Sequence, residues 1–131
     1  MILVDTSAWI EFQRAAGSAS DRRLTQAVER DEELATTGIV LMELLAGARN
    51  DAHASDLRRL LGRCAYLRVE EPTDHELAAD AYRACRRAGE TVRRLPDCLI
   101  AAVAMRTGSP VLHCDADFKT LARHTALQLV S

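Results

Sequence analysis

The stretch Ile2-Leu3-Val4-Asp5-Thr6-Ser7 opens the chain and decides how the fold begins. Three consecutive apolar residues with no polar alternation are typical of a short strand that is buried on both faces of a sheet. Asp, Thr and Ser are all residues that cap the start of a helix. Residues 2–4 are therefore predicted to form a central strand that runs directly into a helix, with Asp5 at the carboxyl end of the strand.

The rest of the chain repeats this alternation of short apolar runs and amphipathic stretches. After a short helix that carries Trp9 and Phe12, further helices are predicted at 21–30, 39–48, 51–62, 73–88, 97–106 and 115–122. Four more strands are predicted at 34–36, 66–69, 110–114 and 127–130. Strands that alternate with helices favour the α/β class, with a mainly parallel, here five-stranded, sheet covered by helices on both faces. Thr73 and Glu76 form a capping box at the start of one helix.

Length and composition narrow the class of protein. The 131 residues fit a single domain, 1–131, with a substantial core. The hydrophobic share of 48% and the net charge of −2 exclude an intrinsically disordered chain. With 17 basic and 19 acidic side chains, the protein does not bind nucleic acid through bulk positive charge.

Cysteine spacing and the absence of targeting signals indicate a cytoplasmic protein. No CxxC pair occurs among Cys64, Cys85, Cys98 and Cys114, so neither a zinc knuckle nor a thioredoxin motif is supported. We expect all four to be small buried thiols in a reducing compartment. The N-terminus does not resemble a signal peptide, and the longest uncharged apolar run is far shorter than the roughly 20 residues of a membrane span.

Acidic side chains occur at positions where they can meet. Asp5 and Asp115 each follow a predicted strand, and in parallel sheets the functional crevice lies beyond the carboxyl ends of the strands. Asp117 follows two residues later, and Asp97 lies in the first turn of a predicted helix. Glu43 has only apolar residues or glycine at helical neighbour positions, so its carboxylate must be paired, neutralised or bound to a cation.

Each of these acids also has a simpler explanation. Asp5, Asp115 and Asp117 could cap helices, Asp97 could interact with a helix dipole, and Glu43 could reach solvent. Together, however, four or five carboxylates at one crevice would repel one another unless cations bind. Oxygen ligands favour Mg²⁺ or Mn²⁺ over Zn²⁺, and such a centre fits phosphodiester hydrolysis.

Four short blocks of the sequence carry a family resemblance. They are Leu3-Val4-Asp5-Thr6-Ser7, Glu43-Leu44-Leu45-Ala46-Gly47, Pro96-Asp97-Cys98-Leu99-Ile100-Ala101-Ala102 and His113-Cys114-Asp115-Ala116-Asp117-Phe118. In this order and spacing they resemble the motifs of PIN-domain nucleases, and the resemblance covers essentially the whole chain. The size and the Asp-Ala-Asp-Phe ending resemble VapC-type toxins of type II toxin–antitoxin modules.

The resemblance implies a three-layer α/β/α sandwich and an endoribonuclease that depends on Mg²⁺ or Mn²⁺. It implies that Asp5, Glu43, Asp97 and Asp115 form the metal site, with Asp117 contributing in some members. Thr6 or Ser7 is expected to orient Asp5 through a hydrogen bond, although both could simply cap the helix. The partners implied are an RNA substrate, a second copy of the chain in a homodimer, and a cognate antitoxin protein in a hetero-oligomer.

Three further residues, Arg93, Arg94 and His113, lie close to these acids in the sequence. Arg93 and Arg94 precede Asp97 and could contact RNA phosphates, or could lie in a solvated loop. His113 lies in a predicted strand, so we expect a buried, hydrogen-bonded histidine rather than a general base.

The sequence leaves two other functions open. One is a PIN nuclease of RNA processing or DNA metabolism outside a toxin module. The other is a non-enzymatic, Mg²⁺-binding phosphoacceptor domain. A phosphoacceptor domain needs an Asp near the middle of the chain and a Lys at the end of one of the last strands, whereas Lys119 falls in a predicted helix.

Overall fold

A computed structural model describes residues 1–130 of the chain, and in this part the sheet has four strands, all parallel. They are β1 (Ile2–Val4), β2 (Leu34–Thr37), β3 (Ala65–Leu67) and β4 (Val111–Leu112), in the order β3-β2-β1-β4. The strand β1 is central and all three of its residues are buried, as the uninterrupted apolar run predicts. Its carboxyl end therefore lies in the middle of the sheet edge.

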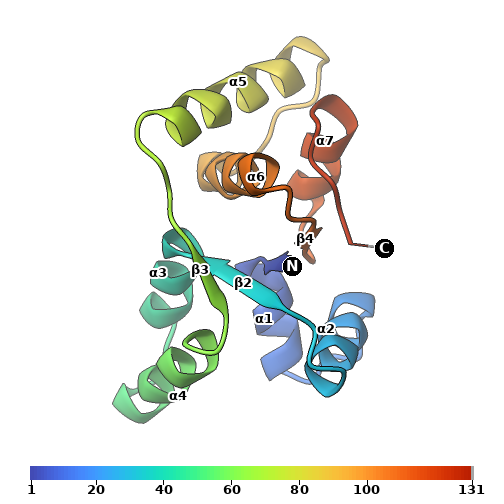
Figure 1. Ribbon diagram of the computed structural model, residues 1–131. Helices are drawn as coiled ribbons and strands as arrows, with labels where there is room; N and C mark the ends of the chain where they lie inside the picture. Colours follow the sequence, from blue (N-terminus) through green and yellow to red (C-terminus); the bar gives the residue numbers. More distant parts are fainter. Residues whose placement is uncertain (131) are drawn as a thin grey trace.

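Seven helices of the described residues flank this sheet (Figure 1). In chain order they are α1 (Thr6–Gln13), α2 (Ala19–Glu29), α3 (Gly38–Ala46), α4 (Asp51–Leu61), α5 (Thr73–Arg87), α6 (Leu95–Thr107) and α7 (Ala116–His124). In Figure 1, α5, α6 and α7 gather above the sheet, and α1 and α2 lie below it. The predicted α/β class and the predicted helices are thus confirmed.

The predicted fifth strand at 127–130 is wrong. In its place, one isolated parallel bridge joins Val111 to Leu129. Val111 donates its N–H to the carbonyl of Gln128 at 3.0 Å, and Val130 donates to the carbonyl of Val111 at 3.0 Å. Because β4 itself has only two residues, it offers too short an edge for a further ladder.

The start of α5 also differs from the prediction. Pro72 is the N-cap residue and no side chain caps this helix, so the capping box at Thr73 is not formed. Asp74 instead accepts the N–H of Glu70 at 2.8 Å, and is fully buried. Its carboxylate also receives two hydrogen bonds from Arg106 of α6, at 2.8 and 3.0 Å. The ion pair between Asp74 and Arg106 therefore attaches the segment that joins β3 and α5 to the end of α6.

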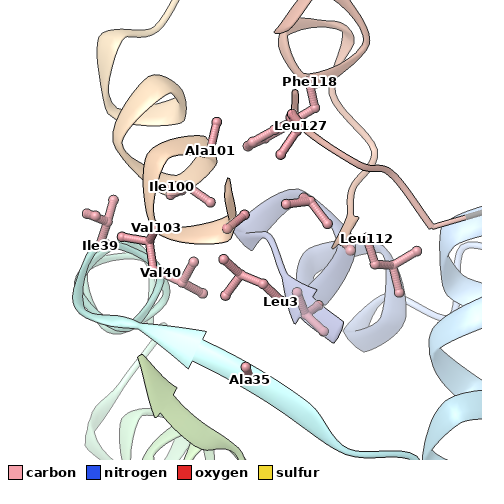
Figure 2. Close-up of a cluster of buried hydrophobic side chains, with 14 of the residues drawn as sticks. Leu3, Ala35, Ile39, Val40, Ile100, Ala101, Val103, Leu112, Phe118 and Leu127 are labelled. Carbon is pink, nitrogen blue, oxygen red and sulfur yellow. The ribbon is translucent and has the colours of Figure 1, made fainter. Parts of the chain in front are cut away.

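The core lies between the sheet and the helix α6. Figure 2 shows Leu3 and Val40 facing Ile100 and Val103 of α6, and all four side chains are fully buried. Burying a side chain of this size contributes about 1.5–3 kcal/mol. Because seven of the residues of α6 are buried, including Asp97 in its first turn, the helix carries a carboxylate deep into the molecule.

Aromatic side chains and cysteines make up other parts of the core. Trp9 is buried and packs edge-on against Phe12, with 5.9 Å between the ring centroids. Cys85 and Cys98 are buried, but Cys64 is only partly buried and Cys114 is exposed, so the expectation of four buried thiols is wrong. None of the helices formed by residues 1–130 combines the length and the apolar character needed to cross a membrane.

Replacing Asp74 by Ala should lower the free energy of unfolding by about 3 kcal/mol, because it leaves Arg106 and the N–H of Glu70 without their partner. Equilibrium urea unfolding measures this loss. Asp56→Ala is the matched control, since Asp56 pairs with Arg59 on the exposed surface of α4 and should leave stability unchanged. Equal effects of the two substitutions would contradict this account.

Candidate metal centre

The carboxyl ends of β1 and β4 place two acidic residues side by side. Asp5 is the N-cap residue of α1, and Asp115 is the N-cap residue of α7. The N–H of Asp5 donates to the carbonyl of Leu112 at 2.9 Å, which joins the two strand ends. Asp5 is 3% exposed, so its carboxylate lies below the surface of the site.

Ser7 holds one oxygen of Asp5. Its backbone N–H and its hydroxyl both donate to Asp5 Oδ2, at 2.9 and 2.5 Å. The same hydroxyl accepts the N–H of Cys114 at 2.9 Å. Ser7 therefore ties the start of α1 to the segment that carries Asp115, in addition to orienting the Asp5 carboxylate. Thr6 turns elsewhere and donates to Glu43 Oε1 at 2.9 Å.

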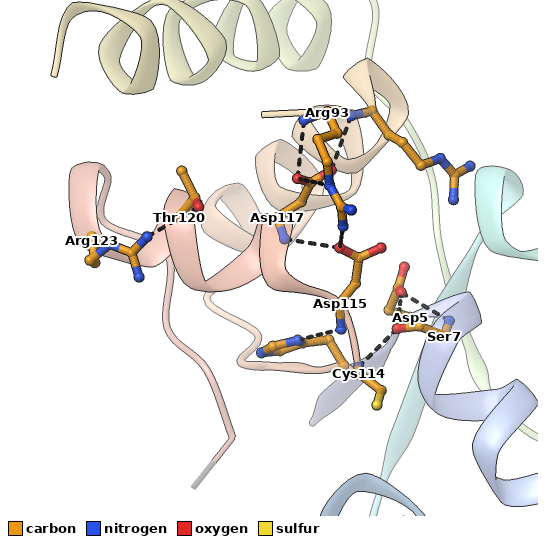
Figure 3. Close-up of polar contacts among 10 residues, drawn as sticks. Asp5, Ser7, Arg93, Cys114, Asp115, Asp117, Thr120 and Arg123 are labelled. Atoms are coloured by element: carbon orange, nitrogen blue, oxygen red, sulfur yellow. Dashed lines mark hydrogen bonds and ion pairs between the residues drawn. The ribbon is translucent and has the colours of Figure 1, made fainter. Parts of the chain in front are cut away.

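Asp97, Asp115 and Asp117 form the closest acidic group, with one carboxylate oxygen from each within 4.8 Å of the others. Asp117 accepts the backbone N–H groups of Arg93 and Arg94, one on each oxygen, both at 3.0 Å. Figure 3 shows Asp115 and Asp117 of this group together with Asp5 and the side chain of Arg93. Asp117 thus fixes the backbone of the loop that leads into α6, and so the position of Asp97.

Burial and mutual repulsion shift the titration of these acids. Burial, together with the neighbouring Asp117 and Asp5 carboxylates, raises the pKa of Asp97 to about 8. Burial also raises the pKa of Asp5, although its hydrogen bonds to Ser7 oppose the shift. Burial acts the same way on Asp117, but the N–H donors of Arg93 and Arg94 outweigh it and hold the pKa of Asp117 below its usual range.

Two arginines partly neutralise the acidic side chains of the site. Arg94 forms an ion pair with Glu43, and the Glu43 carboxylate is only 16% exposed. Arg93 donates to Asp115 Oδ1 at 3.2 Å and lies 3.5 Å from Asp117 Oδ1. The two side chains therefore face the acidic group rather than bulk solvent alone. Glu43 is paired, as its apolar surroundings required.

The residues present fit a divalent cation with oxygen ligands. Asp5 Oδ1 and Asp97 Oδ2 are both buried, and within residues 1–130 neither has a hydrogen-bond partner. A buried carboxylate oxygen without a partner is costly, and a cation would offset that cost. Because every available ligand atom is a carboxylate oxygen, the donor set favours Mg²⁺ or Mn²⁺ over softer metals.

Some features of the site were not visible in the sequence. The amide groups of residues 93 and 94 bind Asp117 through the backbone, which no residue type reveals. Thr37, which lies outside the strand predicted at 34–36, ends β2 next to β1. His113 accepts the N–H of Asp115 at 3.1 Å, and burial lowers its pKa, in line with a structural rather than a basic role.

Comparison with known proteins agrees with this geometry. Residues 2–124 match the family model of the PIN domain. The VapC ribonuclease Mb1587 of Mycobacterium bovis and the ribonuclease VapC11 of Mycobacterium tuberculosis are each 47% identical to the chain over 134 residues, covering all of this chain and 98% of theirs.

Solved structures show the same fold at low sequence identity. VapBC2 of Rickettsia felis, bound to a DNA fragment from its promoter, has a TM-score of 0.77 at 19% identity and covers 99% of this chain and 98% of its own. VapBC-1 of nontypeable Haemophilus influenzae has a TM-score of 0.76 at 18% identity, covering 100% of this chain and 98% of its own.

A parallel sheet with carboxylates gathered at its carboxyl edge defines a nuclease of the PIN class, and the chain belongs to the PIN-domain family. Its similarity to the mycobacterial proteins over the full length places it among the VapC ribonucleases, the toxins of type II toxin–antitoxin modules. The phosphoacceptor alternative is therefore excluded.

Without a cation, the protein should lose stability as the pH rises. The pKa of Asp97 is about 8 in the folded protein and close to 3.8 in the unfolded chain, so folding takes up a proton at any pH between these values. The favourable contribution is present at low pH and disappears as the pH approaches 8. Between pH 5.5 and pH 8.5, the loss due to Asp97 should be on the order of 3 kcal/mol.

Urea unfolding in EDTA at several pH values measures this loss, and Asp97→Asn should remove it because asparagine does not ionise. The comparison of the two proteins cancels the contributions of histidines that titrate in the same range. Identical pH dependence in wild type and Asp97→Asn would show that Asp97 is ionised throughout.

Proposed function

We propose that this VapC ribonuclease is a single nuclease domain, residues 1–131, that cleaves RNA internally with Mg²⁺ or Mn²⁺ held by Asp5, Glu43, Asp97 and Asp115, with Asp117 as a further ligand. The observation that carries this proposal is the pair of buried, unpartnered carboxylate oxygens of Asp5 and Asp97 beside the Asp115–Asp117 group, stated for the described residues 1–130. When bound, the cation would polarise the scissile phosphate and lower the pKa of the attacking water.

The side chains around the proposed cation site support this reaction in different ways. Ser7 fixes the Asp5 carboxylate, and Asp117 fixes the loop that carries Asp97 into the site. Near neutral pH the carboxyl group of Asp97 still holds its proton, so a cation that binds there would displace that proton to solvent. Glu43 is held from one side by Thr6 and from the other by Arg94.

Arg93 and Arg94 are the side chains we assign to the RNA backbone. Their side chains are 71% and 51% exposed, so both guanidinium groups reach the rim of the site. A cation bound to the carboxylates would weaken their present ion pairs. Each guanidinium could then turn to a phosphate oxygen, which it binds through two parallel hydrogen bonds.

We also propose an antitoxin partner. VapBC-5 of Mycobacterium tuberculosis, a further structure with the same fold, is a member of the VapBC family of toxin–antitoxin systems, which supports a cognate antitoxin that binds this chain and blocks cleavage. The free toxin is proposed to be a homodimer that enters a hetero-oligomer with the antitoxin. Light scattering of the purified toxin and of the complex determines both states.

Asp5→Asn should abolish cleavage of RNA in Mg²⁺, with a loss of more than about a hundredfold, because a neutral amide replaces a buried anionic ligand. Initial rates on a labelled single-stranded RNA measure the effect, and calorimetric titration with Mn²⁺ measures binding. Asp56→Asn, on the exposed face of α4, serves as the control and should leave both unchanged. Cleavage by Asp5→Asn at the wild-type rate would refute the proposed site.

Expression of the chain alone should arrest bacterial growth, because it degrades cellular RNA without restraint. Co-expression of the small protein encoded beside it should restore growth, and so should Asp5→Asn. Growth curves combined with a measurement of soluble protein test this directly. Normal growth in the presence of abundant soluble wild-type protein would contradict toxicity.

A further inference from the structure

Thr37 ends the strand β2 at the level of Asp5. Leu3 of β1 pairs with Ala35 of β2 in parallel register, so the same register continued by two residues sets Asp5 beside Thr37. The backbones of both residues are extended. Because side chains alternate along a strand, Thr37 shares the face of Asp5, whereas Thr36 points to the opposite face.

The hydroxyl of Thr37 has no role in starting the following helix. Thr37 is the N-cap residue of α3, yet its side chain makes no capping hydrogen bond. The N-cap side chains of four other helices do accept such a bond, and they are Asp5, Ser18, Asn50 and Asp115. Capping therefore does not explain a threonine at this position.

Thr37 is nevertheless buried, and its hydroxyl oxygen makes no hydrogen bond to the described residues. Its side chain is 0% exposed, and Oγ1 has no hydrogen-bond partner in the part of the chain that the structure describes. Asp5 Oδ1 and Asp97 Oδ2 share this condition, and the carboxylates of Asp5 and Asp97 are close enough to repel each other. The hydroxyl of Thr37 is therefore buried and unsatisfied in register with Asp5, whose Oδ1 also lacks a partner within the described residues.

A single ordered water satisfies such a group, since a buried water makes two to four hydrogen bonds to polar atoms that lack partners. We propose that Thr37 is a positioning residue of the metal centre, whose hydroxyl shares a water with the Asp5 carboxylate and so holds Asp5 oriented for the cation. The inference rests on the proposed function, because it assigns Thr37 to the same cation site.

The test compares three substitutions by calorimetric titration with Mn²⁺. Thr37→Val removes the hydroxyl while keeping the branched shape, and should weaken Mn²⁺ binding by about tenfold or more, as the loss of a group that orients a metal ligand does. Thr37→Ser keeps the hydroxyl and should restore binding to near the wild-type Kd. Thr36→Val is the matched control, since Thr36 is equally buried and unpartnered within residues 1–130 but faces away from Asp5.

The free energy of unfolding distinguishes a positioning role of Thr37 from a role in packing. In EDTA, Thr37→Val should unfold at the same urea concentration as wild type or at a higher one, because it removes a buried hydroxyl that no protein group within the described residues satisfies. Should the valine be too poorly packed to fold, Thr37→Ala removes the hydroxyl without adding a methyl group. Wild-type Mn²⁺ affinity in a folded variant that lacks the hydroxyl, or an equal loss in Thr36→Val, would overturn the proposal.

Failure of this inference is distinguishable from failure of the cation site itself. If Asp5→Asn abolishes Mn²⁺ binding and Thr37→Val does not weaken it, the cation site stands and Thr37 has no part in it. If Asp5→Asn binds Mn²⁺ as wild type does, the site is wrong and the inference falls with it.

Discussion

Negative charge buried at the carboxyl edge of the sheet has to be compensated, and most of the surrounding structure serves that need. Asp5 and Asp97 are almost completely buried, and Asp115 and Asp117 lie against them. This negative charge is compensated by hydroxyls, backbone N–H groups and two arginines rather than by a single counter-charge. The raised pKa of Asp97 shows that this compensation is incomplete without a cation.

The position of α6 follows from the same constraint. This helix is buried along most of its length, so its first turn carries Asp97 into the interior where solvent does not screen the carboxylate. Asp117 holds the preceding loop by accepting two of its N–H groups, which orients the helix entry without a capping side chain. The site is thus supported by well-packed elements, and its ligand geometry depends little on surface side chains.

Sequence reasoning reached the parts of the fold that local patterns encode. The run Ile2-Leu3-Val4 indicated a central strand, and acids after strands indicated the functional edge. It failed where contacts between distant segments decide the secondary structure. Residues 127–130 have a strand-like pattern, but the neighbouring strand β4 has only two residues, so a single isolated bridge forms instead of a fifth strand. It also missed Arg94 as the partner of Glu43, because residues 51 positions apart carry no local signal of contact.

The ion pair between Arg94 and Glu43, with that between Arg93 and the two aspartates, has a bearing on how the protein is made. Both counter-charges belong to the polypeptide, so partial neutralisation of the acidic edge does not wait for an ion from the surroundings. A newly synthesised chain can complete this edge of the sheet whatever the local supply of divalent cations.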